Sequence, residues 1–341
     1  FMAPDSWQGL YVNTLAQVKA GEITMARLDQ AVSRILRVKI RAGLFEAGLP
    51  STRKYAGRYD LLAAPEHRAV ARKAVRQSLV LLKNTQQLLP LSPSANILVA
   101  GDGADNLGKQ TGGWTLSWQG TGNSKVHFPK SMSIFDGIED QVKAAGGKVT
   151  LSADGEYETK PDVALVVFGE NPYAEFQGDR PHLDFQSEEG LALLKKFKSQ
   201  GIPTVAIFLS GRPMWVNPEI NAADAFVAAW LPGTEGGGIA DVLLRSAAGD
   251  IQHDFLGKLS FSWPKTGAQT ALNIGDEDYQ PLFAYGFGLT YADTGAFQVL
   301  SEDAQLGDKA QSQSNNFLKA GEPVSPWRLV MRDSGGTVQV N

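Results

Sequence analysis

Val163-Ala164-Leu165-Val166-Val167-Phe168-Gly169 is an unbroken apolar run, and with its neighbours it decides the fold. Similar short runs stand at 78–82, 97–100, 205–209 and 226–230. Amphipathic helical patterns separate several of them, at 134–144, 187–198 and 238–246. Short strands that are apolar throughout, alternating with helices, are typical of a mostly parallel sheet covered on both faces. We therefore expect an α/β fold, an αβα sandwich.

Toward the N-terminus the sequence predicts helices without a sheet. Apolar residues recur at helical spacing from Leu28 onward, Thr24 is suited to cap that helix, and Gly43 to end it. Pro65 stands at the favoured first position of a further helix that reaches residue 76. Two or three helices cannot close a core, so we expect residues 1–50 to belong to another domain, 51–75 to be a linker, and the sandwich to cover 76–300.

Toward the C-terminus the composition changes. Residues 303–323 are rich in Asp, Gln, Ser, Asn and Gly, which is typical of a linker. A β-like element then begins at 326–331. Residues 301–341 are therefore expected to hold a linker and the start of a β-rich module.

The composition excludes several function classes. The formal net charge is −4 and the chain has no Cys, so a basic nucleic-acid surface, a disulfide framework and thiolate chemistry are not expected. No run is apolar for long enough to predict a membrane-spanning helix, and no His stands at metal-ligand spacing. The glycines at 101–106 fail the dinucleotide pattern at Asn106. We predict no cofactor, no metal, no nucleic acid and no membrane partner.

Two loops follow strands of the predicted sheet, and ligands of such sheets meet the carboxyl ends of the strands. The first contains Gly112-Gly113-Trp114-Thr115-Leu116-Ser117-Trp118-Gln119-Gly120. Indole faces stack on sugar rings, and glycine allows close backbone approach. We expect Trp118, between two polar residues, to contact a ligand, and Trp114 to pack in the core.

The second loop follows Val163–Gly169 and reads Glu170-Asn171-Pro172-Tyr173-Ala174-Glu175-Phe176-Gln177-Gly178-Asp179-Arg180. Carboxylates stand here among aromatic residues, and apolar neighbours would raise the pKa of a carboxyl group toward the range that a general acid needs. The alternative is a solvated acidic loop, but the position at the end of a central strand favours function. Ser210 lacks the G-x-S-x-G context of a nucleophile, and Arg212 is expected to order its turn.

An ordered set of segments resembles family 3 glycoside hydrolases. These segments are 31–39 with Gly43-Leu44-Phe45, 71–84 with Leu89-Pro90-Leu91, the Trp114/Trp118 loop, Ser210-Gly211-Arg212-Pro213, 230–236, and 282–291. The likeness spans about residues 1–291 and is strongest to bacterial exo-β-1,3/1,4-glucanases and plant β-glucan exohydrolases, which share the Trp-x-x-x-Trp-Gln-Gly loop.

The resemblance implies a two-domain active site. Residues 1–50 would be the C-terminal end of a (β/α)8-type barrel that supplies an Asp nucleophile, and the sandwich would supply a Glu acid/base. Carried over by motif, that acid/base is Glu175, with Glu170 as the fallback, and Trp118 forms a wall of the subsite for the second glucose. Asp5 in Asp5-Ser6-Trp7 looks like the nucleophile motif but lies too close to the helix from Leu28. The nucleophile is expected before Phe1, and the isolated segment is expected to be inactive.

The activity implied is that of a retaining exo-acting glucohydrolase on β-1,3/1,4-glucans, secreted or periplasmic, with glucan oligo- and polysaccharides and the missing N-terminal barrel segment as partners. Alternatives from the same family are a β-xylosidase or a β-N-acetylglucosaminidase, although the latter commonly lacks the sandwich domain. Outside the family, a non-catalytic sugar-binding or nucleotide-binding α/β protein remains open.

Overall fold

The computed structural model describes residues 5–306 together with 318–319, 322–323, 329–333 and 336–340. It divides into two compact units, the first ending at Ala64 and the second beginning at Pro65. The functional loops predicted above all lie in the second unit.

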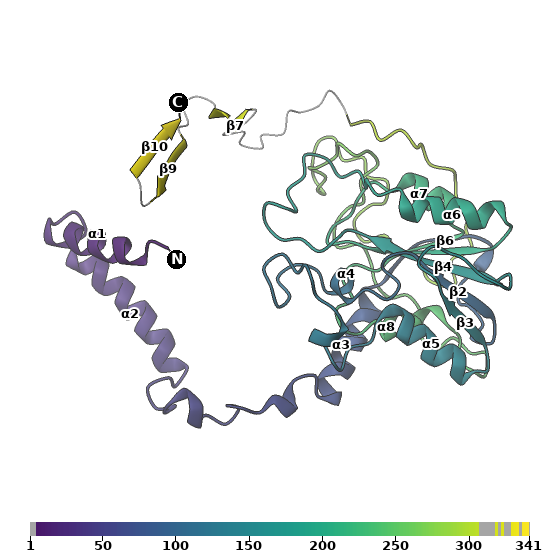
Figure 1. The fold of residues 1–341 in the computed structure, drawn as a ribbon, viewed down its shortest axis with the longest axis horizontal. Coiled ribbons are helices and arrows are strands. Elements are labelled where there is room, and N and C mark those ends of the chain that lie inside the picture. Colours follow the sequence, from purple (N-terminus) through teal and green to yellow (C-terminus); the bar gives the residue numbers. More distant parts are fainter. Residues whose placement is uncertain (1–4, 307–317, 320–321, 324–328, 334–335, 341) are drawn as a thin grey trace. The chain divides into compact units, whose positions relative to one another are not determined.

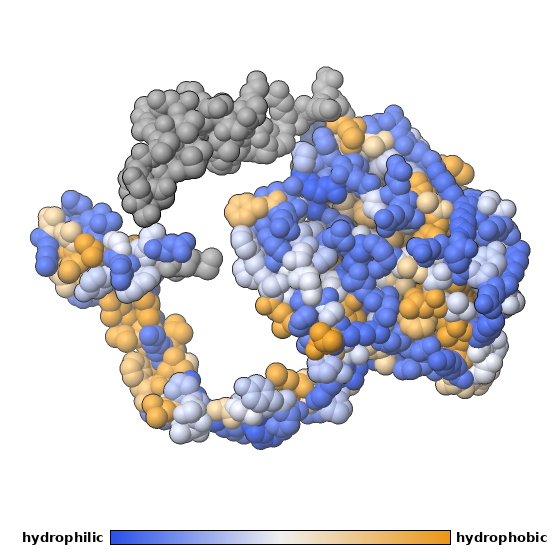
Figure 2. All heavy atoms as spheres, viewed as in Figure 1, coloured by the Kyte–Doolittle hydropathy of each residue, from blue (hydrophilic) through white to orange (hydrophobic). Residues whose placement is uncertain are grey.

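The first unit is helical. Its helices are α1 (Trp7–Lys19) and α2 (Met25–Arg41), followed by single 3-10 turns η1 (Pro50–Thr52) and η2 (Tyr59–Leu61). The Thr24 hydroxyl accepts a hydrogen bond from the backbone N–H of Arg27, which confirms the predicted cap. α2 buries none of its residues, and most of its apolar residues are exposed, as Figure 2 shows. The described residues of this unit hold no strand and form no closed barrel.

A six-stranded sheet forms the centre of the second unit, in the order β1-β6-β5-β4-β2-β3 (Figure 1). Its strands are β1 (Val80–Asn84), β2 (Asn96–Ala100), β3 (Lys148–Leu151), β4 (Val163–Gly169), β5 (Thr204–Leu209) and β6 (Ala225–Ala228). All neighbouring pairs are parallel except β1 with β6 at one edge. The predicted mostly parallel α/β sheet is confirmed.

Helices cover both faces of this sheet. They are α3 (Pro65–Ser78), α4 (Leu107–Thr111), α5 (Ile134–Ala144), α6 (Glu189–Ser199), α7 (Asn217–Ala222) and α8 (Gly237–Leu243), with 3-10 turns η3 (Thr85–Gln87) and η4 (Lys125–His127). α3, α5 and α8 share one apolar core with alternate residues of the strands, while α6 and α7 share the other. Since alternate side chains of a strand point to opposite faces, the unbroken apolar runs fill both cores.

Besides shifts of one to three residues at the ends of several elements, such as β6 and α8, the structure differs from the predicted elements in the following ways. β3 was not predicted, because this edge strand is only half buried and carries Lys148 and Thr150 in place of a continuous apolar run. β1 begins two residues later than expected and includes Lys83 and Asn84, both of them buried. The short helices α4 and α7 are too brief to show a helical period in the sequence.

Beyond residue 306 the described segments are short antiparallel pairs. β7 (Leu318–Lys319) pairs with β8 (Glu322–Pro323), and β9 (Leu329–Asp333) pairs with β10 (Gly336–Val340). Of the β-like element predicted at 326–331, residues 326–328 lie outside the described residues. Residues 307–317 and 320–321 of the linker predicted at 303–323 lie outside them too.

Candidate functional site

The strand order reverses between β2 and β4. From β4 the chain builds outward through β5 and β6, whereas β3 lies on the far side of β2. The loops that follow two adjacent strands diverge at such a point and leave room for a ligand. The two loops singled out in the sequence follow β2 and β4, so the fold brings them to the same edge of the sheet.

Glu175 stands on the second loop and is held by two indole groups from the first. Its Oε2 accepts hydrogen bonds from Trp118 Nε1 at 2.6 Å and from Trp114 Nε1 at 3.1 Å. The rings of Trp118 and Phe176 pack nearly perpendicular to each other, with ring centroids 5.8 Å apart. The structure therefore unites the predicted site residues Glu175 and Trp118.

The electrostatics of Glu175 differ from the expectation. Apolar neighbours were expected to raise its pKa, but its side chain is exposed, and the Trp118 N–H above all, with that of Trp114, lowers the pKa below the ordinary value. Hydrogen bonds from neutral donors stabilise the charged form of a carboxylate. Within this chain Glu175 is an ionised carboxylate at neutral pH.

Trp114 is not a core residue, so that prediction was wrong. Its side chain is 68% exposed, more than the 46% of Trp118. Its backbone is left-handed, with φ of 56°, and so is that of Leu116 at 59°. Such conformations cost a non-glycine residue of order 1 kcal/mol and cluster at functional sites. With this backbone the Trp114 indole N–H reaches the carboxylate of Glu175.

The two loops are joined by more than the indoles. The side-chain amide of Gln119 bridges them: Oε1 accepts from the backbone N–H of Ala174 at 2.7 Å, and Nε2 donates to the carbonyl oxygen of Glu175 at 3.0 Å. Gly113 lies so close to the second loop that a Cβ there would stand 1.8 Å from the carbonyl oxygen of Tyr173. Sequence reasoning missed Gln119 as a site residue, and its position directly after Trp118 was the only signal for it.

Glu170 has different surroundings. Its side chain is 8% exposed and forms an ion pair with Arg212, whose Nη2 and Nε lie 2.7 and 3.1 Å from Oε1. Tyr173 donates its hydroxyl to the other oxygen at 3.0 Å, and burial raises the pKa of this Tyr to about 12. Arg212 also donates to the carbonyl of Gly178 at 2.8 Å. These bonds tie the first residue of the loop to its far end.

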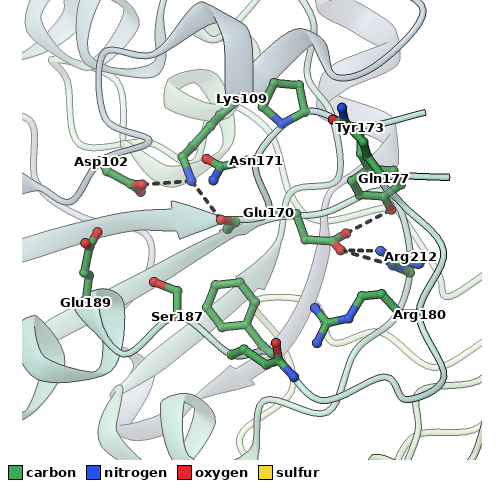
Figure 3. A pocket seen from close by; sticks show the side chains of 14 residues that line it. Asp102, Lys109, Glu170, Asn171, Tyr173, Gln177, Arg180, Ser187, Glu189 and Arg212 are labelled. Atoms are coloured by element: carbon green, nitrogen blue, oxygen red, sulfur yellow. Dashed lines mark hydrogen bonds and ion pairs between the residues drawn. The ribbon is translucent and has the colours of Figure 1, made fainter. Parts of the chain in front are cut away.

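A cavity of about 410 Å³ opens beside this ion pair at the carboxyl ends of β2 and β4 (Figure 3). In Figure 3 Glu170 points toward Arg212, and Lys109 lies between Asp102 and the strand end. The buried Lys109 ammonium is 2.8 Å from Asp102 and donates to the carbonyl of Gly169 at 2.9 Å. The charges that line the cavity are thus largely paired within the protein.

The remaining sequence expectations concern positions away from these loops. Asp5 lies in the first unit, in the turn before α1. Across the described ranges, no three His, Asp or Glu side chains gather as metal ligands would. None of the described helices has the length and apolar character that crossing a bilayer requires.

Comparison with known proteins identifies the family. Residues 79–291 match the Glycosyl hydrolase family 3 C-terminal domain. The structure of exo-1,3/1,4-beta-glucanase (ExoP) from a Pseudoalteromonas species is similar, with 51% sequence identity and a TM-score of 0.87 over 99% of this chain and 42% of that one.

Curated relatives agree with this match. A lysosomal beta glucosidase of Dictyostelium discoideum and a periplasmic beta-glucosidase of Salmonella typhimurium are each 30% identical over 80% of this chain. The chain spans 35% and 41% of the lengths of these two relatives. Because the family match extends over more than half of the chain and coincides with the observed sheet, the chain belongs to glycosyl hydrolase family 3 and carries the C-terminal domain of that family.

Proposed function

We propose that this chain is the acid/base-bearing part of a retaining exo-β-glucan glucohydrolase, which releases glucose from non-reducing ends. The similar ExoP is named an exo-1,3/1,4-beta-glucanase. A beta-glucosidase from Listeria innocua, 25–26% identical, has been crystallised with glucose and, as a variant, with laminaribiose. By analogy with the Salmonella relative, the protein acts in the periplasm or outside the cell, in polysaccharide breakdown.

The observation that carries the proposal is the setting of Glu175. It is an exposed carboxylate in the loop after a central strand, and it accepts hydrogen bonds from the indole N–H groups of two exposed tryptophans. Glu170, five residues earlier, has both oxygens occupied by Arg212 and Tyr173. Of the two carboxylates, Glu175 is the one free to exchange a proton with a sugar, so it is the acid/base, and Glu170 supports the loop.

A retaining mechanism needs a second carboxylate about 5–5.5 Å away as nucleophile. We assign it to a barrel segment that precedes Phe1 in the complete protein, with residues 1–50 as the end of that barrel. The exposed apolar side of α2 supports this assignment, because an amphipathic helix normally buries that side against another element. In the complete site the nucleophile's negative charge would raise the pKa of Glu175, since a nearby like charge disfavours ionisation.

The proposed cycle uses both protonation states of Glu175. Protonated, it gives its proton to the glycosidic oxygen while the nucleophile attacks the anomeric carbon and the aglycone leaves. Ionised, it then takes a proton from the water that hydrolyses the glycosyl-enzyme. The indole donors favour the ionised form that this second step requires. Trp118 is proposed to stack with its face on the second glucose, beside the leaving-group oxygen.

Leaving-group dependence tests the assignment. In the complete protein, Glu175→Ala should lower kcat/KM for laminaribiose by roughly 10²–10⁴-fold, the usual contribution of a general acid. The glycosylation step with a dinitrophenyl glucoside should be nearly unchanged, because that leaving group needs no proton. Glu170→Ala is the matched control and should lower both rates alike through the loop. If Glu170→Ala shows the selective loss and Glu175→Ala does not, the two roles must be exchanged.

A further inference from the structure

We infer that Gln119 is a positioning residue for the acid/base: its side-chain amide fixes the main chain on both sides of the Ala174–Glu175 peptide, and so sets the place of the Glu175 carboxylate. This inference rests on the proposed role of Glu175. Gln119 is half-buried, and each end of its amide bonds to the second loop, at 2.7 Å to the Ala174 N–H and at 3.0 Å to the Glu175 carbonyl.

The geometry makes this bridge specific to the acid/base. A primary amide offers a donor and an acceptor side by side, and here it satisfies the N–H that enters Ala174 and the C=O that leaves Glu175. The next residue, Phe176, has a left-handed backbone with φ of 72°, a conformation that needs neighbouring contacts to hold it. Glu170 and Arg212 join the loop's two ends, whereas Gln119 holds its tip.

The bridge also keeps the two indole groups and the Glu175 carboxylate in a fixed position relative to one another. Gln119 follows Trp118 directly, and the backbone N–H of Trp114 donates to the backbone carbonyl of Trp118 at 2.8 Å. One loop therefore delivers both side-chain donors to Glu175 and the amide that holds its backbone. A carboxylate displaced by about 1 Å can lose on the order of 10²-fold in rate, because proton transfer requires hydrogen-bond reach.

Gln119→Met in the complete protein tests the inference, since it keeps the length of the side chain and removes both hydrogen bonds. We expect kcat/KM for laminaribiose to fall by roughly tenfold or more, and the glycosylation rate with dinitrophenyl glucoside to change less than about threefold. A purely structural loss would lower both rates together. The control is Asn123→Leu, because the Asn123 amide donates at 2.7 Å to the carbonyl of Thr115 within its own loop; it should leave the ratio of the two rates unchanged.

A spectroscopic readout accompanies the kinetics. The Trp118 Nε1–H resonance should titrate with Glu175 in the parent protein, and in Gln119→Met it should lose that titration as the carboxylate moves away. If Glu175→Ala shows the selective loss but Gln119→Met lowers both rates equally and keeps the titration, this inference fails while the proposed function stands. If Glu175→Ala shows no selective loss, the proposed function fails and the inference fails with it.

Discussion

At the residue scale, Trp118 has two separable properties, an N–H donor and an aromatic face. The N–H forms the shorter of the two indole bonds to Glu175, at 2.6 Å against 3.1 Å for Trp114, and it is the main cause of the lowered pKa. The residue as a whole remains 46% exposed, which leaves part of it accessible to a ligand. Phenylalanine at this position would keep an aromatic face and remove only the donor.

Trp118→Phe should therefore raise the pKa of Glu175 toward its ordinary value. The remaining Trp114 Nε1–H resonance serves as the reporter of a pH titration by NMR. Trp114→Phe is the control and should raise the pKa less, because its hydrogen bond is longer. An equal or larger rise in Trp114→Phe would contradict the assignment of the main effect to Trp118.

The aromatic face has its own test. Both Trp118→Phe and Trp118→Ala lose the donor, but only Trp118→Ala loses the proposed subsite wall. In the complete protein, Trp118→Ala should raise KM for laminari-oligosaccharides by roughly fivefold or more over Trp118→Phe, since aromatic stacking contributes on the order of 1 kcal/mol. Aryl glucosides, which lack the second glucose, should hardly distinguish the two variants. Equal KM values for oligosaccharides in both variants would rule out a stacking role.

At the scale of elements, salt bridges join α3 to α8 and to Glu235, which lies just before α8. Arg68 forms an ion pair with the buried Glu235 at 2.7 Å, and Arg72 and Arg76 both pair with Asp241. Glu235 and Asp241 are almost fully buried, so removal of an arginine partner would leave a buried charge unpaired. Glu235, the glutamate of the segment 230–236, therefore has a structural role.

α7 contains a buried carboxyl whose ionisation opposes folding. Burial, and secondarily the charge of Glu302, raises the pKa of Glu219 from 4.5 to about 7. A raised folded-state pKa means that the native protein binds this proton more tightly than the unfolded chain does. The stabilising effect of the proton is full below pH 4.5 and is lost as pH rises through about 7.

Glu219→Gln should consequently stabilise the protein at high pH. The rise from 4.5 to about 7 corresponds to about 3 kcal/mol once the group is ionised, so the gain should grow by about 2 kcal/mol between pH 5 and pH 8. Urea unfolding at the two pH values measures it. Glu189→Gln makes the same chemical change at an exposed first-turn position of α6 and is the matched control. A gain that does not change with pH would refute the account.

The strands show which parts of the fold sequence patterns can predict. The continuous apolar run predicted β4 to the residue, because every residue of this strand is buried, with its side chains in one or other of the two cores. The end of β1 was missed because Lys83 interrupts the apolar pattern. Its buried ammonium donates hydrogen bonds to the carbonyls of Ile220 and Ala223, which are distant in sequence. Patterns within one segment cannot reveal such partners.

The candidate site likewise has features that were visible in the sequence and features that only the fold reveals. A loop at the carboxyl end of a central strand and a pair of indoles are visible in the sequence. The choice of Glu175 over Glu170 came from the family resemblance, and its role stays a prediction. The Trp114 prediction failed because its exposure depends on a left-handed backbone. Gln119 escaped notice because its two partners are 55 and 56 residues away, and only the adjacency of β2 and β4 brings them together.

At the scale of the whole molecule, one half of the proposed catalytic pair lies in this chain. The sandwich has two complete cores, whereas the helices of the first unit bury no residue in α1 or α2. Glu175 is held as a carboxylate by indole donors, and in the proposed function this chain supplies it as the proton-transfer group. The nucleophile and the negative charge that would raise the pKa of Glu175 belong, in this proposal, to the preceding barrel.

The central claim, that Glu175 is the acid/base of a retaining glucosidase, is tested most directly by the configuration of an azide product. Glu175→Gly in the complete protein, given dinitrophenyl β-glucoside and sodium azide, should still form the covalent glucosyl-enzyme, and azide should then enter from the side that Glu175 vacated. Proton NMR should show β-glucosyl azide. Formation of α-glucosyl azide would contradict the account, because it would mean that the substitution had removed the nucleophile.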